Sequence, residues 1–188
     1  MLPSVIINFA IVLINVVCVI CALTVMKPKV LFRYFTTLSN VLCASAALAT
    51  AICGLRGTLP LWVVLFKYVG TAAVAVTLLT VFLFLGPISG QWKHLLSGAD
   101  LFFHLFCPLL AIVSFCFFEK RPFSFAWTAL GVAPVILYGL LYLYKVIYAR
   151  PEKRWEDFYG FNRGGRWGVG MALMFLEGCI VAVLLWLV

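Results

Sequence analysis

The chain has 188 residues, of which 65% are hydrophobic and only 11% are charged. Soluble domains carry about 25% charged residues, so a water-soluble fold is excluded and the bilayer is the expected solvent. The net charge of +8 would suggest nucleic-acid binding in a soluble protein. In a membrane protein, however, basic residues gather in loops and set the topology, so no nucleic-acid partner is expected.

Six apolar segments are separated by short polar or basic loops, and each is long enough to cross the hydrocarbon core, which takes about 20 residues. We therefore expect an all-α polytopic membrane protein, with six transmembrane helices in one bundle forming a single domain over residues 1–188. The first segment lacks a basic start and is too long for a secretory signal, so it is expected to be retained. The expected spans are residues 3–26, 31–55, 59–85, 99–118, 123–148 and 167–188.

Polar residues within the first and third spans have structural explanations. Asn8 and Asn15 lie seven apart on one face of the first helix, and they are predicted to bond to a neighbouring helix. Lys67 lies near one end of the third span, where its long side chain is expected to snorkel out of the hydrocarbon. Cys18 and Cys21 have a metal-pair spacing but no second pair, so packing is the favoured interpretation for them, as for the other five cysteines.

The basic residues are distributed unevenly between the two sides. Loops 1–2, 3–4 and 5–6 with their flanks hold ten Lys and Arg residues, against four on the opposite side. The positive-inside rule then predicts that the odd-numbered loops are cytoplasmic and that both termini are outside. The connector over residues 88–98 includes His94, for which anchoring at the interface is favoured over chemistry.

The second span begins with an unusual number of polar residues. Thr36, Ser39, Asn40 and Cys43 follow i, i+3, i+4, i+7 spacing and share one helical face, which leaves Thr37 off that face. Two interpretations stay open for the hydroxyls: helix capping and packing, or chemistry.

Ionisable residues in the fourth and sixth spans are predicted to face the bundle interior, because exposure to lipid costs several kcal/mol. Thr36 and His104 each lie roughly 5 Å below the same interface by helical rise. A hydroxyl and an imidazole at equal depth are what a nucleophile and its general base require. Asp100, one turn before His104, is expected to orient the imidazole, and Glu177 lies nearer the midplane.

The loop over residues 150–166 precedes the last span. Its basic residues favour binding to anionic headgroups, and its glycines allow a tight turn. One hypothesis is a lid over the mouth of the bundle, with Tyr159 or Asn162 as its polar contact. The other is a disordered charged tether.

The stretch Tyr34-Phe-Thr-Thr-Leu-Ser-Asn40, followed by His104-Leu-Phe-Cys-Pro108, resembles the predicted six-transmembrane-region (Pr-six-Pr) family of bacteria. The aromatic residues 158–162 are also similar to that family's loop before the last span, without its prolines. A more distant likeness is to the androgen-induced and androgen-dependent TFPI-regulating membrane proteins of animals. Those are threonine hydrolases that cleave fatty acid esters of hydroxy fatty acids.

The resemblance implies a location in the bacterial plasma membrane, with Thr36 as nucleophile and His104 as its base. Where the animal proteins carry a second His and a Thr around the catalytic His, this chain has Asp100 and Leu105. The expected function is an intramembrane threonine hydrolase of lipid-like esters that needs no cofactor or metal. Its partners would be membrane lipids and the ester substrate, and its oligomeric state stays open.

Three points stay open at this stage. The oxyanion donor is Asn40, Asn162 or a backbone amide. A second hypothesis for the function is a small proton-linked transporter or lipid-binding protein that uses Glu177 and His104. The third possibility is a non-catalytic assembly partner within the membrane.

Overall fold

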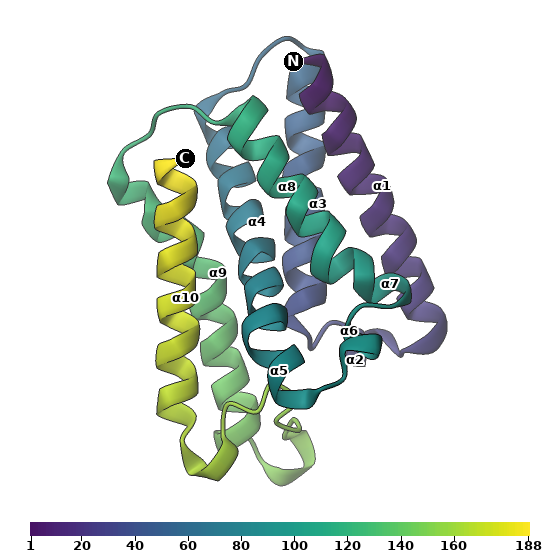
Figure 1. Cartoon of the computed structure of the whole chain (residues 1–188), viewed down its shortest axis with the longest axis vertical. Coiled ribbons are helices and arrows are strands. Elements are labelled where there is room, and N and C mark those ends of the chain that lie inside the picture. Colours follow the sequence, from purple (N-terminus) through teal and green to yellow (C-terminus); the bar gives the residue numbers. More distant parts are fainter.

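The computed structural model describes all 188 residues as a bundle of long helices without strands (Figure 1). Six helical stretches are long and apolar enough to cross a membrane: Leu2–Val25, Phe35–Leu55, Leu61–Ser89, Gly98–Glu119, Phe125–Tyr148 and Trp167–Leu187. Large apolar side chains such as Leu13 and Leu137 are exposed on the outer surface, as contact with lipid requires. The prediction of an all-α, multi-pass integral membrane protein is confirmed.

Several spans are built from more than one helical type. The regular helices are α1 (Leu2–Val25), α2 (Pro28–Leu31), α3 (Phe35–Leu55), α4 (Leu61–Leu79), α5 (Gly86–Ser89), α6 (Trp92–Leu95), α7 (Gly98–Leu101), α8 (Cys107–Ser114), α9 (Thr128–Leu143) and α10 (Trp167–Leu187). Wider π-helical turns span Thr80–Leu85, Phe102–Phe106, Phe115–Glu119 and Tyr144–Tyr148, and short 3₁₀ turns span Phe125–Trp127, Pro151–Lys153 and Arg163–Gly165.

Two boundaries differ from the expectation. The second span starts at Phe35 rather than at residue 31, because residues 28–31 form the separate short helix α2 and Tyr34 is extended. The third span continues to Ser89 instead of ending at residue 85. Pro87 does not stop it, because proline falls in the first turn of α5, where no amide hydrogen is needed.

Both chain ends lie at one end of the bundle, which we call the terminal end (Figure 1). The opposite end, the loop end, carries α2, α5, α6 and the loop before α10. Six spans cross the bundle, and an even number of spans places both termini at the same end, as expected. Which end faces the cytoplasm stays a prediction from the basic residues.

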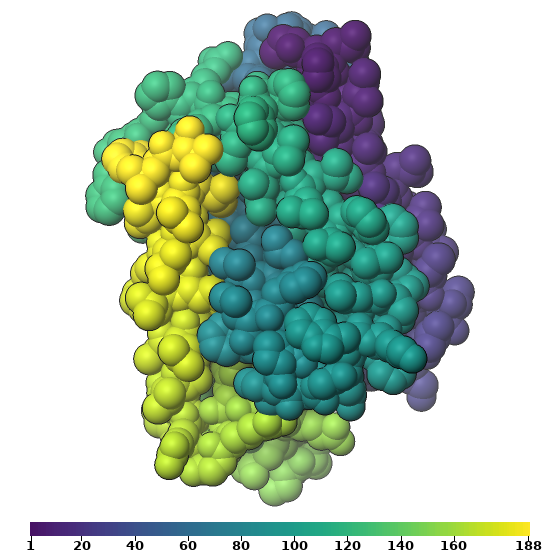
Figure 2. Space-filling view, viewed as in Figure 1, coloured from purple at the N-terminus to yellow at the C-terminus, as the bar shows by residue number.

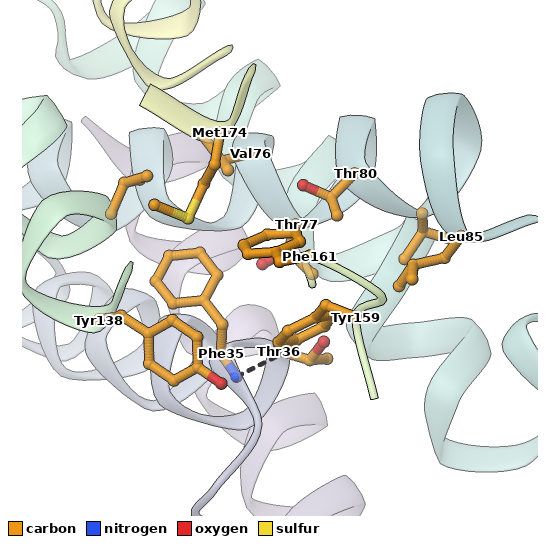
Figure 3. A pocket seen from close by; sticks show the side chains of 12 residues that line it. Phe35, Thr36, Val76, Thr77, Thr80, Leu85, Tyr138, Tyr159, Phe161 and Met174 are labelled. Atoms are coloured by element: carbon orange, nitrogen blue, oxygen red, sulfur yellow. Dashed lines mark hydrogen bonds between the residues drawn. The ribbon is translucent and has the colours of Figure 1, made fainter. Parts of the chain in front are cut away.

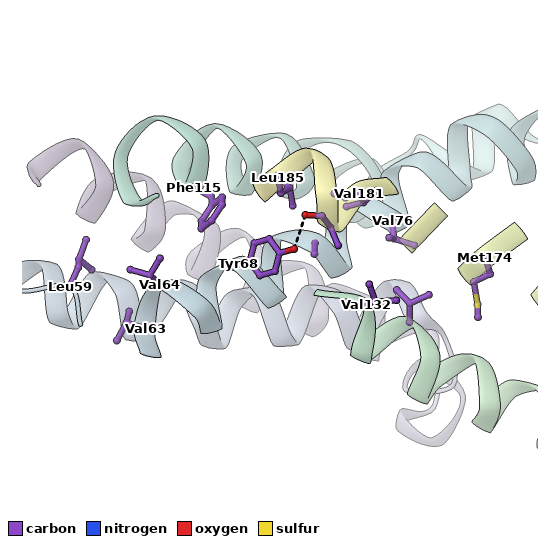
Figure 4. Packing of buried hydrophobic residues seen from close by; sticks show 14 residues of the cluster. Leu59, Val63, Val64, Tyr68, Val76, Phe115, Val132, Met174, Val181 and Leu185 are labelled. Carbon is purple, nitrogen blue, oxygen red and sulfur yellow. Dashed lines mark hydrogen bonds between the residues drawn. The ribbon is translucent and has the colours of Figure 1, made fainter. Parts of the chain in front are cut away.

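Helix α4 occupies the centre of the bundle. It packs against α3, α8, α9 and α10, and small residues allow that approach: a Cβ added at Gly70 would lie 2.9 Å from the Cα of Cys43. Tyr68 is fully buried in the main apolar cluster and donates a hydrogen bond of 2.7 Å to the Ala182 carbonyl of α10 (Figure 4). Across the face shown in Figure 2, α10, α4, α8 and α1 lie side by side.

The expectation that Lys67 snorkels out is wrong. Its side chain is fully buried, with Nζ 3.6 Å from Glu119 Oε2 and donating to Asn8 Oδ1 at 2.5 Å. The other carboxylate oxygen of Glu119 accepts hydrogen bonds from Ser4, Asn8 and Ser114. Since α4 is surrounded by helices, Lys67 has no path to the surface and is paired instead. The prediction that Asn8 bonds to neighbouring helices is confirmed.

We expect Lys67→Met to destabilise the protein by about 3–5 kcal/mol, because it leaves the Glu119 carboxylate buried without a counter-charge. The double variant Lys67→Met, Glu119→Gln should recover most of that loss. Thermal unfolding in detergent measures both, with the exposed Lys93→Met as control. Equal loss of stability in the single and double variants would contradict the pairing.

Candidate functional site

Thr36 lies in the first turn of α3 at the loop end and lines a small internal cavity of about 30 Å³ (Figure 3). Nine of the twelve residues around the cavity are hydrophobic. Its hydroxyl groups come from Thr36, Thr77, Thr80 and two tyrosines, Tyr138 and Tyr159. The site is therefore an apolar space with a few hydroxyls at defined positions, which is the usual composition of a small-ligand site.

The fourth span brings His104 to Thr36. The distance from Thr36 Oγ1 to His104 Nε2 is 3.3 Å, and His104 Nδ1 lies 2.7 Å from the carbonyl oxygen of Leu95. A carbonyl only accepts hydrogen bonds, so Nδ1 must carry the proton and donate it. In the neutral imidazole Nε2 is then unprotonated and accepts from the Thr36 hydroxyl. The predicted pairing of these two residues is present, with the tautomer that a general base needs.

Asp100 does not orient the imidazole as expected. Its side chain is exposed, and the bond to Nδ1 comes instead from the backbone carbonyl of Leu95. This carbonyl belongs to α6 in the connector, which folds back against the start of the fourth span. His104 itself lies in the π-helical turn Phe102–Phe106, a feature that is frequent at functional sites.

Ser39 and Asn40 hold the backbone of Thr36 rather than its hydroxyl. Ser39 Oγ and Asn40 Nδ2 both donate to the Thr36 carbonyl, at 3.1 and 2.8 Å. Ser39 also shares a 2.8 Å hydrogen bond with the hydroxyl of Thr77, and Asn40 donates to the Phe103 carbonyl at 3.1 Å. Both amide hydrogens of Asn40 are therefore in use, and it has none left for an oxyanion.

Thr37 is buried too, although its helical phase suggested otherwise. Only 2% of its surface is exposed. Helix α3 packs against both α1 and α4, so a single inward face cannot describe it. Burial therefore does not distinguish Thr36 from Thr37; the contact of Thr36 with His104 does.

The loop before α10 is folded over the cavity, as the lid hypothesis expects. The Asp157 carboxylate accepts hydrogen bonds from the Tyr142 hydroxyl and from the amides of Phe161 and Asn162, all at 2.8–2.9 Å. Its aromatic residues pack on Tyr138 and Tyr142. These contacts order the loop, so it is not a disordered tether.

Tyr159 is the residue through which this lid meets the second span. Its hydroxyl oxygen accepts a 2.9 Å hydrogen bond from the amide of Phe35, at the start of α3 (Figure 3). Burial raises the pKa of Tyr159 to about 12, so the phenol keeps its proton. Accepting from Phe35 does not use the O–H of Tyr159 as a donor, and Tyr159 lines the cavity beside Thr36.

Asn162 does not reach the site. Its amide bonds to Asp157, and its side chain lines a separate small cavity together with Trp167. Of the two residues predicted as polar contacts of the lid, only Tyr159 has this role.

Glu177 faces the bundle interior as predicted, with 8% of its surface exposed. Its Oε2 accepts a 3.0 Å hydrogen bond from Thr80 of the third span, so it touches neither Thr36 nor His104. Thr77 and Thr80, which link the polar residues of α3 and α10, were missed from sequence because a threonine inside a span is usually a packing residue.

No family model, curated protein or solved structure matches the chain. All seven cysteines are free, and no three His, Cys, Asp or Glu side chains are grouped to hold a metal ion.

We expect Asp157→Asn to loosen the lid, because its NH₂ group replaces one of the two oxygens that each accept a backbone amide, and the remaining oxygen carries no charge. Hydrogen bonds to a charged group contribute about 1.5–3 kcal/mol each, so the amides of Phe161 and Asn162 should exchange at least about tenfold faster. Hydrogen exchange in detergent, with the exposed Glu156→Gln as control, measures this. Unchanged exchange in Asp157→Asn would refute the anchoring role.

Proposed function

We propose that the protein is an intramembrane threonine hydrolase that cleaves lipid-like esters. The observation that carries this proposal is the contact of 3.3 Å between Thr36 Oγ1 and His104 Nε2, with Nδ1 held by the Leu95 carbonyl. A hydroxyl paired with an imidazole whose other nitrogen is fixed is the arrangement of an activated nucleophile. The resemblance to the animal threonine hydrolases points to the same two residues by an independent route.

In the proposed first step, His104 Nε2 takes the hydroxyl proton while Thr36 Oγ1 attacks the ester carbonyl. The tetrahedral intermediate collapses as His104 returns the proton to the leaving alcohol, which leaves the acyl group on Thr36. Water then attacks the acyl-enzyme with His104 as base again, and the carboxylic acid is released. The Leu95 carbonyl bonds to Nδ1–H throughout and stabilises the imidazolium.

Tyr159 is the proposed oxyanion donor. The candidates expected from sequence do not serve, because Asn40 has no free amide hydrogen and Asn162 lies elsewhere. The Tyr159 hydroxyl is held by the Phe35 amide, which does not use its O–H as a donor, and it lies on the cavity wall beside Thr36. A preoriented donor in an apolar site stabilises developing negative charge far more than the same donor in water.

The cavity supports a lipid-like substrate. Its lining is mostly hydrophobic, and it opens at the end of a membrane bundle. The family resemblance extends this to fatty acid esters of hydroxy fatty acids or similar lipid esters. The proposed place of the reaction is the cytoplasmic side of a bacterial plasma membrane.

We expect a fluorophosphonate probe to label the detergent-purified protein, and labelling to be lost in Thr36→Ala and in His104→Ala. Thr36→Ala has no nucleophile, and His104→Ala has no base to activate it; removing a base typically costs 10²- to 10⁴-fold. Thr37→Ala, a buried threonine one residue away, is the matched control and should label normally. In-gel fluorescence and intact mass measure the adduct. Undiminished labelling in both variants would refute the proposal.

Tyr159→Phe should lower kcat for a lipid ester by about 10²-fold, with little change in KM, because an oxyanion donor acts in the transition state. The exposed Tyr144→Phe is the control. Ester turnover measures both, and thermal unfolding shows whether the lost Phe35 contact has affected folding. Equal kcat in Tyr159→Phe and the wild type would exclude Tyr159 as the donor.

A further inference from the structure

A second and larger cavity, of about 190 Å³, forms a groove beside the Thr36 cavity. One wall is a face of α10 whose residues recur every three or four positions: Arg166, Val169, Gly170, Leu173, Met174 and Glu177. The other wall follows the end of the third span, with Thr80, Phe84 and Ile88 four residues apart. The groove therefore runs along α10 from the loop end into the bundle.

Two basic residues, Arg163 and Arg166, stand at the mouth of this groove. Neither has a carboxylate within 4 Å, since the one ion pair of the structure joins Lys67 and Glu119. The Arg163 side chain lies across Gly160 of the lid, where an added Cβ would be 3.0 Å from Nε. Helix α10 begins at Arg166 without any side-chain cap, so the positive end of its dipole is also directed at the mouth.

The inner end of the groove holds an unsatisfied acceptor. Glu177 is more than nine-tenths buried, and its Oε1 has no hydrogen-bond partner, while Oε2 is bonded to Thr80. A buried polar atom without a partner costs about 1–3 kcal/mol. A ligand in the groove that donates a hydrogen bond to Glu177 Oε1 would remove this cost.

The groove and the Thr36 cavity share a wall of four residues: Thr80, Tyr159, Phe161 and Met174. A ligand in the groove thus lies next to the proposed nucleophile and oxyanion donor. Glu177 is eleven residues past Arg166, roughly 16 Å along the helix. The side chains of Arg163, Arg166 and Glu177 all line the groove, so a ligand that extends along it contacts both the arginines and the glutamate.

We infer that the groove binds the polar half of a single-chain glycerophosphate lipid. The phosphate lies between the two arginines and the start of α10. Two guanidinium groups and a helix N-terminus bind a phosphate dianion better than they bind a singly charged carboxylate. The free glycerol hydroxyl donates to Glu177 Oε1. The acyl ester then lies at the shared wall, within reach of Thr36.

This inference rests on the proposed function for the bond that is cleaved, whereas binding in the groove does not depend on turnover. Hydrolysis there adds one water to the ester and gives a fatty acid and a glycerophosphate, with Thr36 and His104 acting as described. Among lipids that end in a phosphate, the monoacylated form keeps the glycerol hydroxyl that Glu177 requires, and the diacylated form does not.

The test measures equilibrium binding to the Thr36→Ala protein in detergent, with oleoyl lysophosphatidate as the probe. Three comparison ligands each lack one part of the probe. Monooleoylglycerol lacks the phosphate, oleate lacks the glycerophosphate unit, and glycerol 3-phosphate lacks the acyl chain. We expect lysophosphatidate to bind at least tenfold more tightly than each of these. The double variant Arg163→Gln, Arg166→Gln and the single variant Glu177→Met should each weaken lysophosphatidate binding at least tenfold.

The matched control is Arg150→Gln, Lys153→Gln, which removes two exposed basic residues of the same loop outside the groove. An equal loss in this control would reduce the effect to general surface charge and overturn the inference. Equally tight binding of oleate, monooleoylglycerol or glycerol 3-phosphate would overturn it as well.

Failure of this inference can be separated from failure of the proposed function. Loss of selective binding with intact fluorophosphonate labelling of the wild type refutes the groove and leaves the hydrolase. Selective binding in a protein that the probe does not label refutes the hydrolase and leaves the groove.

Discussion

Within hydrocarbon no water is available to a buried polar group, so each one needs a partner from the protein. The third span supplies that partner in three of the polar clusters of this bundle. Lys67 pairs with Glu119, Thr77 bonds to Ser39, and Thr80 bonds to Glu177. Because α4 contacts the helices on all sides, its few polar residues connect spans that are far apart in the sequence.

The polar groups at the two ends of the bundle differ in how completely they are paired. At the terminal end, Lys67, Glu119 and their hydroxyl and amide partners are buried and closely packed, which suits a structural role. At the loop end, the polar residues border two cavities, and Glu177 Oε1 and Asn40 Oδ1 have no hydrogen-bond partner. A ligand can satisfy such atoms only where a cavity borders them, which favours the loop end for the proposed site.

Hydrophobicity was enough to predict the six spans, because each must bring about 20 apolar residues to the bilayer. Helical phase and depth were enough to bring Thr36 and His104 together. They failed for Asp100, because the group that bonds His104 Nδ1 is a backbone carbonyl, which no side-chain pattern reveals. They failed for Lys67 because snorkelling depends on whether a helix is central or peripheral, and a single sequence does not give that position.

The π-helical turns explain why periodicity was least reliable near the polar residues. Thr80, His104 and Glu119 each lie in such a turn, and a π turn inserts an extra residue that rotates the following side chains relative to an ideal helix. Three of the polar contacts therefore lie where the helix is not regular, and there a period of 3.6 residues per turn does not give the direction of the side chain.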